Sequence, residues 1–122
     1  MANKHWTLTV RNGPHVERVR FETLDAAVDA MERRVDELAP TARRDAIQVF
    51  RRRFDAIRQV AVRAEITGPG GILGRSYGGV DLRGDGSAEA YLGRYRRSLV
   101  ELQPGETAYD GLRRALEADT AS

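Results

Sequence analysis

Alternating apolar and polar residues near the N-terminus predict a pair of strands. In residues 6–10, a tryptophan, a leucine and a valine alternate with threonines, as in a strand with one buried face. Residues 17–21 repeat the period of two. Asn12-Gly13 between them is a strong hairpin signal, although Pro14 argues against a plain two-residue turn. We therefore expect an antiparallel hairpin.

The clearest period in the chain is helical and covers residues 24–38. Apolar side chains recur there at spacings of three and four residues. Thr23 can cap the start of this helix. Pro40 is expected to end it, because the residue before a proline is pushed out of the helical region. The segment predicts one long amphipathic helix.

Residues 42–58 fit two patterns. On a helical wheel their apolar side chains gather on one side, while Arg44, Arg51 and Arg58 stack on the other. As strands, residues 47–54 would pair with the segment that follows. We favour the strand interpretation because no residue caps or ends such a helix before the strand that follows, although the period does not favour it. The helix stays open as the alternative.

The second half of the chain mixes strand and turn signals. Residues 60–67 alternate as a half-buried strand, and the glycine-rich segment 68–79 predicts a mobile loop, followed by a short strand at 80–83. From Ser87 to Leu102, apolar residues fit one helical face, with a series of strands as the rival interpretation. Thr107 is expected to cap a final helix.

These elements predict one α+β domain over residues 1–118 with a frayed tail at 119–122. Its sheet is expected to be mainly antiparallel, with the helix at about 24–38 and C-terminal helices packed on it. The chain has no cysteine, which excludes disulfides and thiolate metal sites. No apolar run approaches the ~20 residues that cross a bilayer. A cytoplasmic protein that does not contact membranes is expected.

The basic residues are strongly biased towards arginine. Lys4 is the only lysine among 20 basic residues, and 18 acidic residues leave a net charge of +2. One interpretation is a codon bias of the genome. The other is a surface that binds phosphate or carboxylate groups, because the guanidinium fork grips them in a bidentate manner. The small net charge is unlike that of a dedicated nucleic-acid binder.

The sequence contains no recognisable catalytic constellation, cofactor fingerprint or metal-ligand set. The glycine-rich segment has neither the lysine nor the spacing of a phosphate-binding loop. His5 and His15 lack a third ligand placed by sequence. We therefore predict a non-enzymatic interaction module without cofactor or metal, whose partner is a protein, including a second copy of the chain, or a polyanion such as RNA.

Two sets of residues are the candidates for binding. For a polyanion they are arginines from two clusters, namely Arg51, Arg52, Arg53, Arg94, Arg96 and Arg97. The alternative function is a small enzyme or ligand-binding domain with its site under the loop 68–79. The edge of that site would be formed by Arg75, Ser76, Tyr77 and Asp81.

Overall fold

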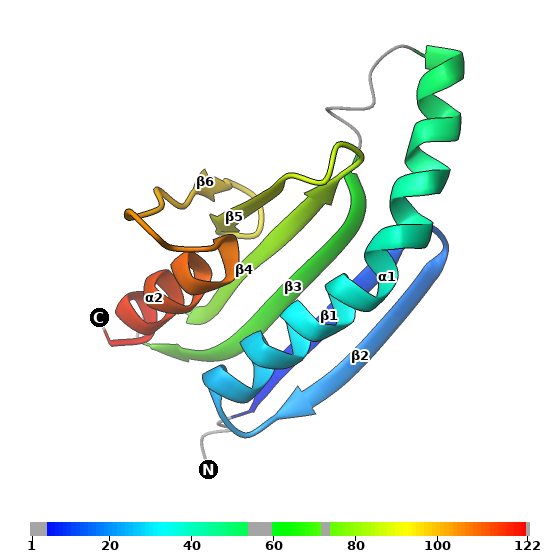
Figure 1. The fold of residues 1–122 in the computed structure, drawn as a ribbon. Coiled ribbons are helices and arrows are strands. Elements are labelled where there is room, and N and C mark those ends of the chain that lie inside the picture. The colour runs from blue at the N-terminus through cyan, green and yellow to red at the C-terminus, as the bar shows by residue number, and fades with distance from the viewer. Residues whose placement is uncertain (1–4, 54–59, 72–73, 122) are drawn as a thin grey trace.

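The computed structural model describes residues 5–53, 60–71 and 74–121, of which 44–53, 70–71, 74 and 121 are described by backbone alone. Six strands form one antiparallel sheet in the order β2-β1-β3-β4-β5-β6, and two helices pack on one face of it (Figure 1). The elements are β1 (Trp6–Asn12), β2 (His15–Phe21), α1 (Leu24–Arg53), β3 (Val60–Gly71), β4 (Gly74–Arg83), β5 (Ala88–Leu92), β6 (Ser98–Leu99) and α2 (Ala108–Ala121). The expected α+β class with an antiparallel sheet is confirmed.

The N-terminal hairpin is present, and its turn has two residues, although Pro14 argued against a turn of that length. Asn12 pairs with His15, so β1 and β2 are joined by Gly13 and Pro14 alone. Gly13 has a φ of 59°, which supplies the positive φ that a two-residue hairpin turn needs. Pro14 is accommodated because β2 is an edge strand.

The core lies between the helices and the face of the sheet that they cover, here called the covered face. The strands contribute Trp6, Leu8, Val10, Val62, Ala64, Ile66, Val80, Leu82 and Ala90, and the helices contribute Leu24, Ala27, Val28, Met31, Val35, Ala42, Ala108, Tyr109, Leu112 and Leu116. Because side chains alternate along a strand, the residues between these core positions point to the opposite face.

The prediction of a loop at 68–79 was wrong for residues 68–71 and 74–79, which belong to the paired strands β3 and β4, and residues 72–73 lie outside the described part of the chain. Two of the glycines there, Gly68 and Gly78, make room for side chains from distant elements. A Cβ on Gly68 would lie 2.1 Å from the ring of Trp6, and one on Gly78 would lie 2.9 Å from Leu112 of α2. Glycine is needed at these positions for close packing rather than for a turn.

The predicted end of the first helix at about residue 38 was also wrong. α1 continues through Pro40 to Arg53, so the strand interpretation fails for residues 47–53, and the remainder of that segment lies outside the described residues. A proline inside a helix costs about 3 kcal/mol. Burial of Ala42, which is 4% exposed, anchors the turn that follows Pro40 in the core. No helix within the described ranges is long and apolar enough to span a membrane.

The helix predicted from Ser87 to Leu102 is replaced by β5 and β6, as in the rival interpretation. Gly93, with a φ of 94°, turns the chain out of β5. The final helix is present and begins where Thr107 caps it. The Thr107 hydroxyl accepts from the Asp110 amide, and the Asp110 carboxylate accepts from the Thr107 amide, both at 3.1 Å. α2 continues to Ala121, into the segment assigned to a tail.

Candidate anion-binding surface

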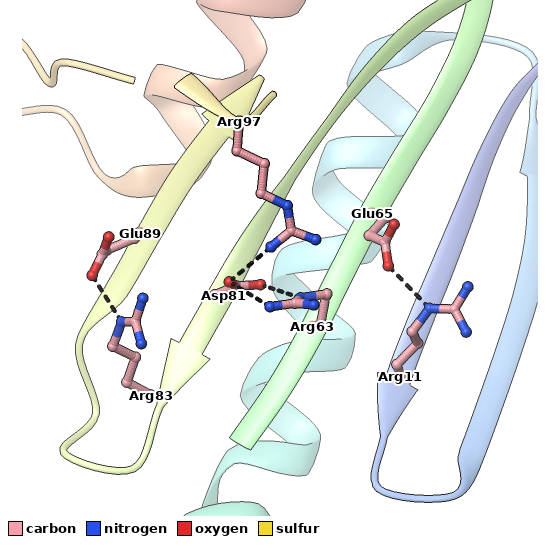
Figure 2. Close-up of polar contacts among 7 residues, drawn as sticks. All are labelled: Arg11, Arg63, Glu65, Asp81, Arg83, Glu89 and Arg97. Carbon is pink, nitrogen blue, oxygen red and sulfur yellow. Dashed lines mark hydrogen bonds and ion pairs between the residues drawn. The ribbon is translucent and has the colours of Figure 1, made fainter. Parts of the chain in front are cut away.

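The second face of the sheet, here called the open face, is rich in polar side chains. Figure 2 looks onto this face, with α1 visible behind the sheet. Strand alternation and register place on it Arg18 and Arg20 of β2, Thr7, Thr9 and Arg11 of β1, Arg63, Glu65 and Thr67 of β3, Arg75, Tyr77, Asp81 and Arg83 of β4, and Glu89 and Tyr91 of β5. Opposite charges thus lie on neighbouring strands.

Asp81 is the most enclosed acid of this face. Its side chain is only 7% exposed, and the Arg63 guanidinium donates to its two oxygens at 2.9 and 3.2 Å (Figure 2). The hydrogen bonds to Asp81 raise the pKa of Arg63. Arg97, from the turn after β5, approaches the same carboxylate at 3.7 Å. Two arginines therefore neutralise one buried acid.

The other two carboxylates of the open face are also engaged by arginines. Arg11 Nε donates to Glu65 at 3.0 Å, and Arg83 Nε donates to Glu89 at 2.8 Å (Figure 2). Glu65 is nearly buried, whereas Glu89 is 39% exposed. The first ion pair joins the neighbouring strands β1 and β3, and the second joins the neighbouring strands β4 and β5. The carboxylates of the described open face are therefore already occupied.

The ring of Tyr91 packs against the guanidinium of Arg97 in a cation–π contact. Tyr91 is paired with Gly79 on β4, and a Cβ on that glycine would lie 2.6 Å from the Tyr91 hydroxyl. The guanidinium of Arg97 stands 4.4 Å from the centre of the ring. Burial, followed by the charge of Asp81, raises the pKa of Tyr91 to about 12. Its buried hydroxyl has no hydrogen-bond partner among the described residues.

A groove runs across the strands beside this network. It consists of a hollow of about 570 Å³ where β4 begins and β5 ends, and a hollow of about 220 Å³ over β1, β2 and β3. The two hollows share Thr67, Arg75, Tyr77 and Arg94 in their linings. We call them together the arginine groove, after its members Arg11, Arg18, Arg75, Arg94 and Arg96.

Most of the groove arginines lack a carboxylate partner within the described ranges. Among the described residues, Arg75 donates only to the Gly68 carbonyl, at 3.5 Å, and the Arg94 guanidinium lies 5.7 Å from the centre of the Tyr77 ring. No ion pair to Arg18 or Arg96 is formed by the described residues. The acidic residues of the lining are Glu65, which Arg11 binds, and Asp119. The groove is therefore cationic.

The arginines predicted to bind a polyanion are placed in three different settings. Arg94 and Arg96 line the groove. Arg97 turns away from it, towards Asp81 and Tyr91. The side chains of residues 51–53, in the last turn of α1, lie outside the described part of the structure.

The four residues of the predicted small-ligand site do not form one site. Arg75 and Tyr77 line the groove. Ser76 lies on the covered face, where its hydroxyl is 3.2 Å from that of Thr120 in α2, and Asp81 is paired with Arg63. The described residues of the loop that was predicted to cover the site belong to β3 and β4.

Sequence reasoning missed Arg18 and the threonines Thr7, Thr9 and Thr67. A signal for part of this set was available, because the alternation in β1 placed Thr7 and Thr9 on the face away from the core. The hairpin register then puts Arg18 opposite Thr9. Pairing of β1 with β3, which brings Thr67 opposite Thr7, has no local signal in the sequence.

The groove alone carries the argument about function. Among the described residues, no group of three histidine or acidic side chains is placed to hold a metal ion. Comparison of the chain with protein-family models, with curated proteins and with solved structures finds no match. The charges and the shape of the groove are therefore the features that indicate a function.

Proposed function

We propose that this chain is a non-enzymatic interaction module that binds a polyanion in the arginine groove. One observation carries the proposal. Arg18, Arg75, Arg94 and Arg96 line one groove without carboxylate partners among the described residues, while the acids of the open face are engaged by other arginines. Cations gathered in this way repel each other, and an anionic ligand removes that repulsion.

Phosphate groups match this groove in geometry as well as in charge. A guanidinium presents several donors in one plane and binds a phosphate through two parallel hydrogen bonds. The hydroxyls of Thr7, Thr9 and Thr67 add further donors between the arginines. A chain of phosphates that crosses the strands would meet arginines at both ends of the groove and hydroxyl groups between them.

The lining favours a polyanion over a protein partner. The centre of a protein–protein interface is usually apolar and depleted of charge. Among the described residues that line the larger hollow, Leu92 is the only one with an aliphatic side chain. The exposed Leu99 lies on β6 outside both hollows.

The dependence of affinity on salt tests the proposal. We expect the purified chain to bind both a mixed-sequence DNA single strand and inorganic polyphosphate. If four arginines neutralise phosphates, the logarithm of the affinity for the DNA should fall with the logarithm of the salt concentration with a slope of about −3. Absence of binding to both polyanions at about 50 mM salt would overturn the proposal.

A pair of arginine substitutions locates the binding surface. Arg75→Gln removes a groove cation and should lower the salt slope by about 0.7 to 1, with a several-fold loss of affinity. Arg33→Gln is the matched control, because Arg33 is exposed on α1, on the opposite side of the sheet, and forms no ion pair with a described residue. Equal losses in both variants would mean that binding follows net charge and not the groove.

A further inference from the structure

Two tyrosines accompany the unpaired arginines at one end of the groove. Building on the proposed function, we propose that the polyanion is a single-stranded nucleic acid. One unpaired base stacks on the ring of Tyr77, and Tyr95 provides a second platform beside it. The phosphates on either side pair with Arg75, Arg94 and Arg96.

Tyr77 occupies the junction of the arginine groove. Its side chain lines both hollows and is partly exposed on the open face. The guanidinium of Arg94 lies 5.7 Å from the centre of its ring, so one planar cation already rests over this aromatic surface. A nucleobase is also planar and can take this position while Arg94 moves to a phosphate.

Tyr95 is held near Tyr77 by the backbone of the turn after β5. The amide of Gly93 donates to the carbonyl of Tyr77 at 2.8 Å, which ties the turn to β4. A Cβ on Gly93 would lie 2.4 Å from the carbonyl oxygen of Arg96, so the turn requires glycine here. Arg94 lies 5.7 Å from the rings of both tyrosines.

The exposure of Tyr95 points to a ligand for its ring. Tyr95 is 89% exposed and contacts Arg94 as its cation–π partner. An aromatic ring left in water beside unpaired arginines is the combination that binds single strands, because every base has a π-face that can stack. In a duplex the faces of the bases are covered by their neighbours, and inorganic polyphosphate has no bases.

The remainder of the groove offers a path for the backbone of the strand. From Tyr77 on β4 the lining continues through Thr67 and Thr9 to Arg18 on β2. At about 4.8 Å per strand this path is ~15 Å long, which suits a few nucleotides. The nucleic acid would thus run across the strands of the sheet rather than along them.

Fluorescence anisotropy with the full chain tests this inference. The probe is a labelled DNA single strand of about 12 nucleotides, within the ~4–16 nucleotides typical of such binding sites. Two further ligands are compared with it. One is a duplex of the same sequence, and the other is inorganic polyphosphate, which is added as a competitor. The wild type should prefer the single strand to the duplex.

The variants separate stacking from charge. Tyr77→Leu should weaken single-strand binding by about 5- to 150-fold, whereas Tyr77→Phe keeps the aromatic face and should bind as the wild type does. The inhibition constant of polyphosphate, corrected for the affinity of each protein for the probe, should be equal in all three proteins. Tyr95→Ala and Tyr95→Phe repeat the test at a side chain too exposed to affect folding, so a folding defect of Tyr77→Leu does not block the experiment.

The outcomes distinguish the two proposals. If the leucine and alanine variants bind the single strand as the wild type does, or if the duplex binds as tightly, the stacking inference is overturned. Salt-dependent binding of polyphosphate would then still support the proposed function. If neither polyphosphate nor the single strand binds at about 50 mM salt, both proposals fall.

Discussion

The two faces of this sheet are made by alternate residues of the same strands, yet they solve different physical problems. On the covered face, apolar side chains such as Ile66 are fully buried against helix residues such as Leu112, and Gly68 lets the ring of Trp6 approach the backbone. On the open face, Asp81 and Glu65 are nearly as buried but are compensated by arginines. The comparison suggests that the covered face provides stability, while the open face keeps a surplus of cations available.

The largest expected effect comes from a pair of substitutions, one in α2, which packs on the covered face, and one on the open face, where Leu99 pairs with Tyr91. Leu112→Ala removes a fully buried side chain and should lower the free energy of unfolding by about 2–5 kcal/mol. Leu99→Ala makes the same change on the open face, where Leu99 is 70% exposed, and should cost less than about 0.5 kcal/mol. Urea unfolding of both variants measures the difference. Equal losses in the free energy of unfolding would contradict the conclusion that the covered face, and not the open face, provides the stability.

A smaller effect is expected within the open face itself. Asp81→Asn leaves Arg63 and Arg97 without their buried counter-charge. It should cost about 1–3 kcal/mol, below the value for a fully buried pair because Arg63 is one-third exposed. Glu89→Gln breaks the more exposed pair with Arg83 and should cost about 0–1 kcal/mol. A larger loss at Glu89 in chemical denaturation would contradict the importance given to Asp81.

The smallest expected effect has the opposite sign. Tyr91→Phe removes a buried hydroxyl that lacks a partner among the described residues, and should raise the free energy of unfolding by up to about 1 kcal/mol near neutral pH. A clear loss of stability, measured by urea unfolding, would show that the hydroxyl is satisfied in solution.

The same tyrosine predicts a dependence on alkaline pH. Burial raises the pKa of Tyr91, and that of Tyr109 in α2, to about 12, above the ordinary value of 10. The unfolded chain therefore loses these protons first, so wild-type stability should fall as the pH rises from about 10 to 12. Tyr91→Phe and Tyr109→Phe should each reduce this fall, and an unchanged pH profile in either variant would contradict the assignment for that residue.

The features that the sequence predicted correctly depend on neighbouring residues. The caps at Thr23 and Thr107 each act on an amide three residues ahead, and both are present in the structure. The β1–β2 hairpin likewise joins segments that are adjacent in the chain. Signals of this kind are complete within a short window, which is why sequence patterns show them.

The errors arose where a distant contact decides the local structure. Gly68 indicated a loop in the sequence. Glycine is required at this position because the ring of Trp6, on the distant strand β1, packs against it. Pro40 indicated a helix end because nothing local shows that Ala42 is buried beyond it. The arginine groove follows the same rule. The cluster at Arg94 and Arg96 was visible in the sequence, but its continuation to Arg18 depends on the order of four strands.

The contact between Trp6 and Gly68 also constrains how the chain can evolve. The three atoms nearest to a Cβ at position 68 all belong to the indole ring, at 2.1 to 2.7 Å. A side chain at 68 therefore becomes acceptable only after the residue at 6 has become smaller, and the two changes must occur in that order. Lineages that descend from this protein should change position 68 only where position 6 has already changed, although 61 residues separate the two in the sequence.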